Sequence, residues 1–172
     1  MFEQMLRVGR EIARVLEAGG IRVIHDRTFH DYPSYNASYG NARHTIQKHL
    51  EEHPEICMVL DIHRDAVPAE QYETEVNGED ISKVRLFVGR SNPNSAANKQ
   101  FARQLKAAAD EAYPGLVKDI FIGRGNYNQE LYPQAILLEF GTHEIEKEKV
   151  IGATEYMADV LDEVLFGASA KA

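Results

Sequence analysis

Two titratable side chains follow apolar runs of the sequence, His63 in "VLDIHRDA" and Glu139 in "AILLEFG". Such runs predict strands buried in a parallel sheet, and ligands bind beyond the carboxyl ends of such strands. A carboxylate flanked by Leu138 and Phe140 is costly to bury unless it has a partner or its pKa rises. A carboxyl group of raised pKa suits acid–base catalysis, and a neutral imidazole suits zinc. The two residues therefore predict metal-assisted hydrolysis. The structural alternatives are a hydrogen-bonded His63 and a Glu139 that pairs with Arg64 or Arg124.

A loop rich in Tyr, Ser and Asn, "HDYPSYNASYGNAR", holds a second group of candidate residues. Polar aromatic loops bind sugars or peptides through flat apolar faces and hydroxyl donors, so Tyr35 is a candidate for substrate binding. A solvated loop whose tyrosines cover the sheet is the alternative. His30 followed by Asp31 matches a metal ligand with its supporting carboxylate, although a local turn contact explains the pair as well. The histidines of the next helix fall on a mostly polar face and are predicted to be solvated, namely His44, His49 and His53.

Nucleophilic catalysis finds no support in the sequence. No serine stands in a Gly-x-Ser-x-Gly turn, and the one cysteine, Cys57, is predicted to be a small core residue of its strand. A single cysteine also excludes a disulfide within the chain. The glycines of "GRGNYNQE" lack the spacing of a dinucleotide or phosphate loop.

The length and charge of the chain limit its class. At 172 residues and 19.4 kDa it fits one domain, and 44% hydrophobic residues are ordinary for a globular fold. The net charge of -8 argues against nucleic acid as a partner, because phosphate binding needs a concentrated basic face. No apolar stretch reaches the roughly 20 residues of a membrane-spanning helix, so the sequence predicts a soluble chain.

The elements that must position these residues follow from the hydrophobic period and the turn signals. Asn77-Gly78 lies between two strand-like runs and predicts a hairpin. We expect helices at 2–18, 42–52, 95–112 and 145–166, and strands at 21–25, 56–62, 71–76, 82–88, 118–123 and 134–141. The alternation predicts an α/β fold with a mostly parallel twisted sheet, helices on both faces and one antiparallel hairpin.

Several of these motifs, taken in order, resemble the stage II sporulation protein P family. They are "HDYPSYNASYGNAR", "DIHRDA", "FVGRSNPN" and "YNQELYPQAILLEFGTHE", and the resemblance extends from about residue 8 to 165. Members of this family are zinc-dependent N-acetylmuramoyl-L-alanine amidases that cleave peptidoglycan. The resemblance implies a six-stranded amidase fold, a Zn²⁺ cofactor, and an exported protein tethered outside the membrane by an upstream segment. Partners in the engulfment machinery, foremost a lytic transglycosylase, are implied as well.

Carried over to this sequence, the resemblance makes His63 a zinc ligand and Glu139 the catalytic carboxylate. It also implies substrate binding by Arg64, Tyr35 and Asn128, although Arg64 could instead pair with a neighbouring aspartate. In the family a strand before the first helix carries further zinc ligands, a His-Thr-His segment and a Glu, whereas this sequence starts at that helix. We therefore expect a single amidase-like domain, truncated at its N-terminus, that binds zinc weakly or not at all and is inactive alone. The alternative is a noncatalytic module that binds the cell wall or a partner in the same groove.

Overall fold

A four-stranded sheet forms the centre of the fold. The computed structural model describes residues 2–167, except for the side chains of Phe2 and Tyr35. The strand order is β1-β6-β4-β5, with parallel pairing of β1 with β6 and of β4 with β5 and antiparallel pairing of β4 with β6. The strands are β1 (Val59–Asp65), β4 (Val84–Gly89), β5 (Val117–Gly123) and β6 (Ala135–Thr142). A separate antiparallel hairpin joins β2 (Glu73–Val76) to β3 (Glu79–Ser82).

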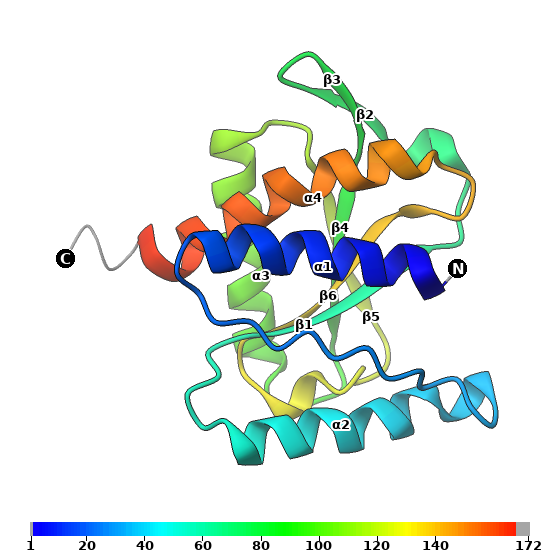
Figure 1. Cartoon of the computed structure of the whole chain (residues 1–172), viewed down its shortest axis with the longest axis vertical. Coiled ribbons are helices and arrows are strands. Elements are labelled where there is room, and N and C mark those ends of the chain that lie inside the picture. Colours follow the sequence, from blue (N-terminus) through cyan, green and yellow to red (C-terminus); the bar gives the residue numbers. More distant parts are fainter. Residues whose placement is uncertain (1, 168–172) are drawn as a thin grey trace.

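Four α-helices surround this sheet, and they are α1 (Phe2–Ala18), α2 (Ser38–Glu52), α3 (Ser95–Ala112) and α4 (Lys147–Asp162). Helices α1 and α4 lie side by side across the sheet, whereas α2 lies apart from both (Figure 1). Among residues 2–167, no helix is both long and apolar enough to cross a membrane. The mixed α/β architecture, with a mostly parallel sheet and one hairpin, confirms the predicted fold class.

The two faces of the sheet differ in polarity because side chains alternate along each strand. Leu86 on β4 pairs in register with Leu138 on β6, and both side chains are fully buried in the core. The next register pair, Arg85 with Glu139, therefore lies on the opposite face. The core occupies the apolar face, and the polar face remains for the candidate site.

The helices form where the apolar residues recur at helical spacing. In α1, Val8, Ile12 and Leu16 are buried at intervals of four residues, so one face of this helix packs into the core. Gly20 follows the helix with φ of 91°, a left-handed conformation that suits glycine at a helix end. In α3, Phe101 and Leu105 bury the corresponding face. The predictions of these two helices are confirmed, including their bounds.

Two predicted strands differ from the structure. Residues 21–25 have no strand pairing, although their β-branched side chains favour an extended backbone. The predicted strand 82–88 is split at Lys83, whose backbone N–H donates to the carbonyl of Tyr72 at 2.6 Å. The hairpin therefore closes with β3, and β4 leaves it to join the main sheet. Helix α2 begins at Ser38, four residues earlier than predicted. The prediction missed the first turn because its polar residues have the composition of a loop.

The strand that carries His63 is less buried than predicted. In residues 2–167, β1 is an edge strand and all seven of its residues are half-buried, so the prediction of a buried strand is wrong here. The strand begins at Val59, and Cys57 lies before it and is exposed. Cys57 is therefore not a core residue, because the apolar run extends beyond the strand that it predicts.

Candidate active site

His63 and Glu139 lie side by side on the polar face of the sheet. His63 on β1 pairs in register with Glu139 on β6, and Glu139 pairs on its other side with Arg85 on β4. The guanidinium of Arg85 reaches Asp119 on β5. We call these four residues, His63, Glu139, Arg85 and Asp119, the polar row, which takes one residue from each of the four strands.

Arg85 links the carboxylates of this face. Its Nε and Nη2 donate to the two carboxylate oxygens of Asp119 at 2.8 Å and 3.1 Å, and its Nη1 donates to Asp65 Oδ2 at 2.8 Å. The same Nη1 lies 3.7 Å from Glu139 Oε2. The side chains of Arg85, Asp65 and Glu139 are all about 14% exposed or less, so little solvent screens them. One guanidinium therefore partly neutralises three carboxylates.

Tyr72 brings a hydroxyl group to the same carboxylates. Its ring is fully buried, and its Oη lies 2.9 Å from Asp65 Oδ2 and 3.3 Å from Glu139 Oε2. A hydroxyl has one hydrogen to donate, so it serves one of these oxygens at a time. Burial, with the nearby charges of Glu139 and Asp65, raises the pKa of Tyr72 well above its usual value, so the phenol stays protonated as a donor.

The surroundings of Glu139 raise its pKa. Burial and then the neighbouring Asp65 raise the pKa of Glu139, and Arg85, the Tyr72 hydroxyl and His63 offset only part of this effect. Burial raises a carboxyl pKa because the charged form loses its hydration. A carboxyl group whose pKa moves toward neutrality can accept a proton from water and release it again.

His63 is held by a carboxylate and an aromatic ring. Its Nε2 lies 3.0 Å from Asp61 Oδ1, and its ring is nearly parallel to that of Tyr39, with a centroid distance of 6.1 Å and an angle of 7°. Burial alone would lower the pKa of His63, but the carboxylates of Asp61, Glu139 and Asp31 outweigh burial and raise it. The imidazole therefore has a fixed orientation and a strongly acidic surrounding.

The donor atoms around His63 do not complete a zinc site within residues 2–167. Catalytic zinc usually has three protein ligands and a water molecule. In this part of the chain, no three ligand atoms of His, Cys, Asp or Glu that include His63 lie within 4.8 Å of one another. The residues present therefore do not fit the zinc centre that the resemblance implies, because no third ligand atom in the described residues joins His63 and the adjacent Asp61.

The three predicted substrate-binding residues are placed differently. Side chains alternate along β1, so Arg64 points to the face opposite His63. The side chain of Tyr35 lies outside the described part of the chain. Asn128 is buried with a left-handed backbone, φ of 57°, and its Nδ2 donates to the carbonyl of Tyr39 at 2.8 Å. Asn128 thus holds the residue whose ring covers His63.

Several residues of the site were not expected from the sequence. Glu139 has Arg85 as its basic neighbour, not Arg64 or Arg124 as the sequence suggested. Arg85 interrupts the buried run of β4 with a charge, and this signal could have identified it. Tyr72 and Asp65 gave no such signal, because the hairpin that begins after Tyr72 brings them together only in three dimensions.

Comparisons with known proteins agree with this architecture. The family described as stage II sporulation protein P matches residues 2–162. Stage II sporulation protein P of Bacillus subtilis (strain 168) is 29% identical over 174 residues, which cover 94% of this chain and 43% of that relative.

Two solved structures share the fold. The N-acetylmuramoyl-L-alanine amidase AmiC2 of Nostoc punctiforme has a TM-score of 0.59 at 12% identity, covering 98% of this chain and 83% of that one. The catalytic domain of CwlV, an N-acetylmuramoyl-L-alanine amidase from Bacillus (Paenibacillus) polymyxa var. colistinus, has a TM-score of 0.55 at 12% identity, covering 96% and 82%.

Proposed function

The chain belongs to the stage II sporulation protein P family, and on this premise we propose that it contributes to the hydrolysis of peptidoglycan during engulfment. The bond to be cleaved is the amide between the lactyl group of N-acetylmuramic acid and L-alanine of the stem peptide. Support comes from two solved structures with the same fold, each of which is described as an N-acetylmuramoyl-L-alanine amidase. The chain spans less than half of its curated relative, so the activity of a longer protein enters here only as a proposal.

The register between His63 and Glu139 is the observation that carries this proposal. A hydrolase of this kind needs a base close to the group that positions the reacting water. The backbone pairing of β1 and β6 holds these two residues as direct neighbours on one face. Arg85 and Tyr72 restrain the carboxylate from its other side.

The chemistry assigned to Glu139 follows from its raised pKa. In this proposal Glu139 accepts a proton from a water molecule, and the oxygen of that water attacks the amide carbon. The same carboxyl group then gives this proton to the leaving nitrogen as the carbon–nitrogen bond breaks. The products are a free carboxylate on the lactyl group and a free amino group on L-alanine. The Tyr72 hydroxyl can move its hydrogen bond from Glu139 to Asp65 as the charge on Glu139 changes.

The zinc ion implied by the family remains a prediction for a chain that brings further ligands to His63. Catalytic zinc needs about three protein donors, and His63 supplies one within residues 2–167. We therefore expect chain 1–172 to be inactive alone. The extracytoplasmic location and the lytic transglycosylase partner are proposals for a protein with the length of the curated relative. Substrate contacts by Arg64, Tyr35 and Asn128 also stay predictions.

A noncatalytic wall-binding module is the second candidate, and the incomplete donor set around His63 favours it. Chain 1–172 and an upstream-extended version are incubated with purified sacculi and zinc. Soluble muropeptides and new L-alanine amino groups are then measured, together with the protein that pellets with the sacculi. Pelleting without release by either version would support the binding module.

The substitution Glu139→Gln separates catalysis from binding in the same assay. Made in the upstream-extended version, it removes the base and keeps the size of the side chain, so release should be lost while pelleting persists. Glu148→Gln, at an exposed position in the first turn of α4, is the matched control and should leave release unchanged. Undiminished release by the Glu139→Gln variant would contradict the proposed function.

A further inference from the structure

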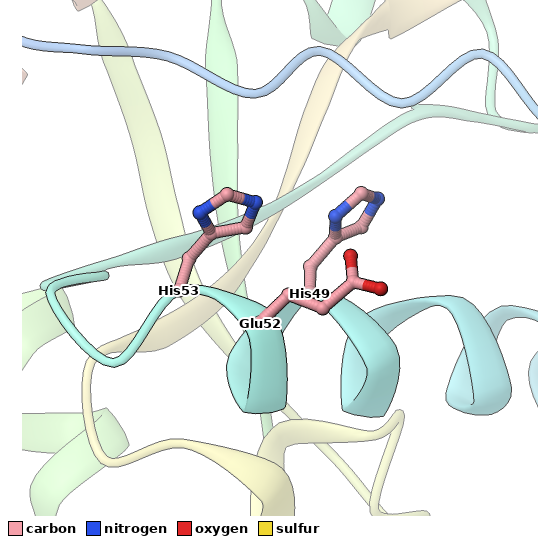
Figure 2. A group of neighbouring side chains, drawn as sticks. All are labelled: His49, Glu52 and His53. Carbon is pink, nitrogen blue, oxygen red and sulfur yellow. The ribbon is translucent and has the colours of Figure 1, made fainter.

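Helix α2 carries a group of metal-ligating side chains that the polar row does not use. His49, Glu52 and His53 each offer a ligand atom, and these three atoms lie within 4.8 Å of one another. Figure 2 shows the three side chains rising from the same side of α2, with the two imidazole rings next to each other. His49 and Glu52 lie one turn apart on a face of α2, and His53 is the C-cap residue that follows Glu52. The sequence alone suggested only solvated histidines here.

His49 has the hydrogen-bonding pattern of a metal ligand. Its Nε2 lies 2.9 Å from Asp26 Oδ2, so Nε2 carries the hydrogen that Asp26 accepts. The lone pair then resides on Nδ1, which is buried and has no hydrogen-bond partner. A histidine that binds a metal through one nitrogen usually donates the other N–H to a carboxylate. The arrangement of Asp26 and His49 therefore matches a ligand with its supporting carboxylate.

The other two donors are free to move toward an ion. His53 Nδ1 is 3.7 Å from Glu55 Oε1, beyond hydrogen-bonding distance, and the rings of His49 and His53 have centroids 6.3 Å apart. Glu52 is exposed, so its carboxylate can change rotamer at little cost. Ligand atoms at about 2.0 Å from a tetrahedral zinc ion are roughly 3.4 Å apart. Rotamer changes that move the ligand atoms by about 1 Å would therefore bring them to the spacing that zinc requires.

We propose that His49, Glu52 and His53 form a second binding site for a divalent transition metal, with zinc as the best chemical match. Two imidazoles and a carboxylate suit zinc, whereas calcium and magnesium take oxygen ligands. The three side chains leave a fourth position for water. This site is separate from His63, because the residue stacked on His63 is Tyr39, roughly 15 Å of helix away from His49.

Such an ion would fasten the segment before α2 to that helix. The segment runs antiparallel to α2 and is held by side-chain contacts of Arg22 with Glu55, Asp26 with His49, and His30 with Thr45, and by Asn41 to the carbonyl of His30. An ion on Nδ1 fixes the ring of His49 and with it the acceptor position of Asp26. The site is therefore a structural one that joins residues 22–30 to α2.

Equilibrium dialysis of chain 1–172 against zinc tests this proposal, with cobalt(II) absorption as a second readout. We expect one bound ion per chain and a visible cobalt spectrum of a tetrahedral site. Substitution of either ligand, His49→Ala or His53→Ala, should weaken binding by about 100-fold, and Asp26→Asn by about 10- to 100-fold. His44→Ala, a histidine of the same helix outside the cluster, and His63→Ala should leave binding unchanged.

The variant Glu52→Gln completes the test, because a substitution at this exposed position is not expected to disturb folding. Glu52 is exposed, so Glu52→Gln should leave the melting temperature of the metal-free chain unchanged and weaken zinc binding by about tenfold. Binding that survives in His49→Ala and His53→Ala, or that disappears in His63→Ala, would overturn the proposal. The absence of binding by the unaltered chain at about 100 μM zinc would do the same.

Discussion

Glu139 stands in register between His63 on one neighbouring strand and Arg85 on the other. The backbone pairing of β6 with both strands sets these positions, and no loop is needed to bring the three side chains together. An acid–base group placed in this way has a histidine on one side and a permanent cation on the other. The following predictions test what each neighbour does for it.

Removal of Arg85 should be costly for folding. Arg85→Ala leaves Asp65 and Glu139 buried with like charges and without the guanidinium between them, so we expect a loss of about 3 kcal/mol or more in the free energy of unfolding. Arg85→Lys keeps the charge and loses the bidentate contact with Asp119. Its free energy of unfolding should therefore lie between those of the unaltered chain and of Arg85→Ala. Urea denaturation measures both variants. A loss below about 1 kcal/mol for Arg85→Ala would show that solvent screens this face.

The Tyr72 hydroxyl should contribute to both stability and protonation. Tyr72→Phe removes a donor from two buried carboxylates, so we expect about 1–3 kcal/mol of lost stability by urea denaturation. Because this hydrogen bond favours the ionised form, its loss should raise the pKa of Glu139 further. Infrared titration of the carboxyl band detects that change, and a pKa that stays constant would place the hydroxyl on Asp65 alone.

Asn128 should be sensitive to backbone conformation and to its side chain separately. Asn128→Gly loses the hydrogen bond to Tyr39 but tolerates the left-handed backbone. Asn128→Ala loses the same hydrogen bond and also strains the backbone at this position. A left-handed alanine costs about 1 kcal/mol more than glycine, so the alanine variant should be the less stable by that amount. Thermal denaturation of the two variants gives the comparison, and equal stability would contradict the role of the backbone.

Tyr113 should make stability depend on alkaline pH. Its hydroxyl donates to Asp159 Oδ2 at 2.7 Å, and this hydrogen bond with burial raises the pKa of Tyr113 to about 12. The folded pKa exceeds the unfolded value of about 10, so the contribution is complete below pH 10 and is lost as pH rises toward 12.

Tyr113→Phe should therefore be less stable than the unaltered chain at about pH 8 by about 1 kcal/mol, and this difference should shrink at about pH 11. Urea denaturation at both values measures it. A difference that stays constant with pH would contradict this role of the hydroxyl, because the variant keeps the ring that packs against Tyr156.

The sequence predicts those parts of the fold that depend on one element at a time. The four-residue period of Val8, Ile12 and Leu16 fixes a helix face wherever the chain places it. The prediction of a strand at residues 21–25 is wrong because a strand, unlike a helix, requires a pairing partner that the local pattern cannot specify. Cys57 failed because an apolar run does not show where its strand begins.

The same distinction applies to the candidate site. His63 and Glu139 could be found because each ends an apolar run, and their contact follows from the parallel pairing of the strands. The roles of Tyr72 and Arg85 depend on the split after β3 and on the antiparallel pairing of β4 with β6. Neither feature has a local signal. The charge within the buried run of β4 marks Arg85 as a candidate, but its place beside Glu139 and the contribution of Tyr72 emerge only from the three-dimensional structure.

The polar row takes each of its members from a different strand, and this has a consequence for the motions of the protein. Fluctuation of a single loop cannot separate His63, Glu139 and Arg85, because each has a register partner in the ladder of the sheet, and Asp119 on β5 is held to Arg85 through its side chain. Only a cooperative opening that disrupts the ladder can do so. Backbone amides flanking the row in β4 and β6 should therefore exchange with deuterium as slowly as the most protected amides of the molecule, and the geometry of the row should disappear in the same transition as the fold.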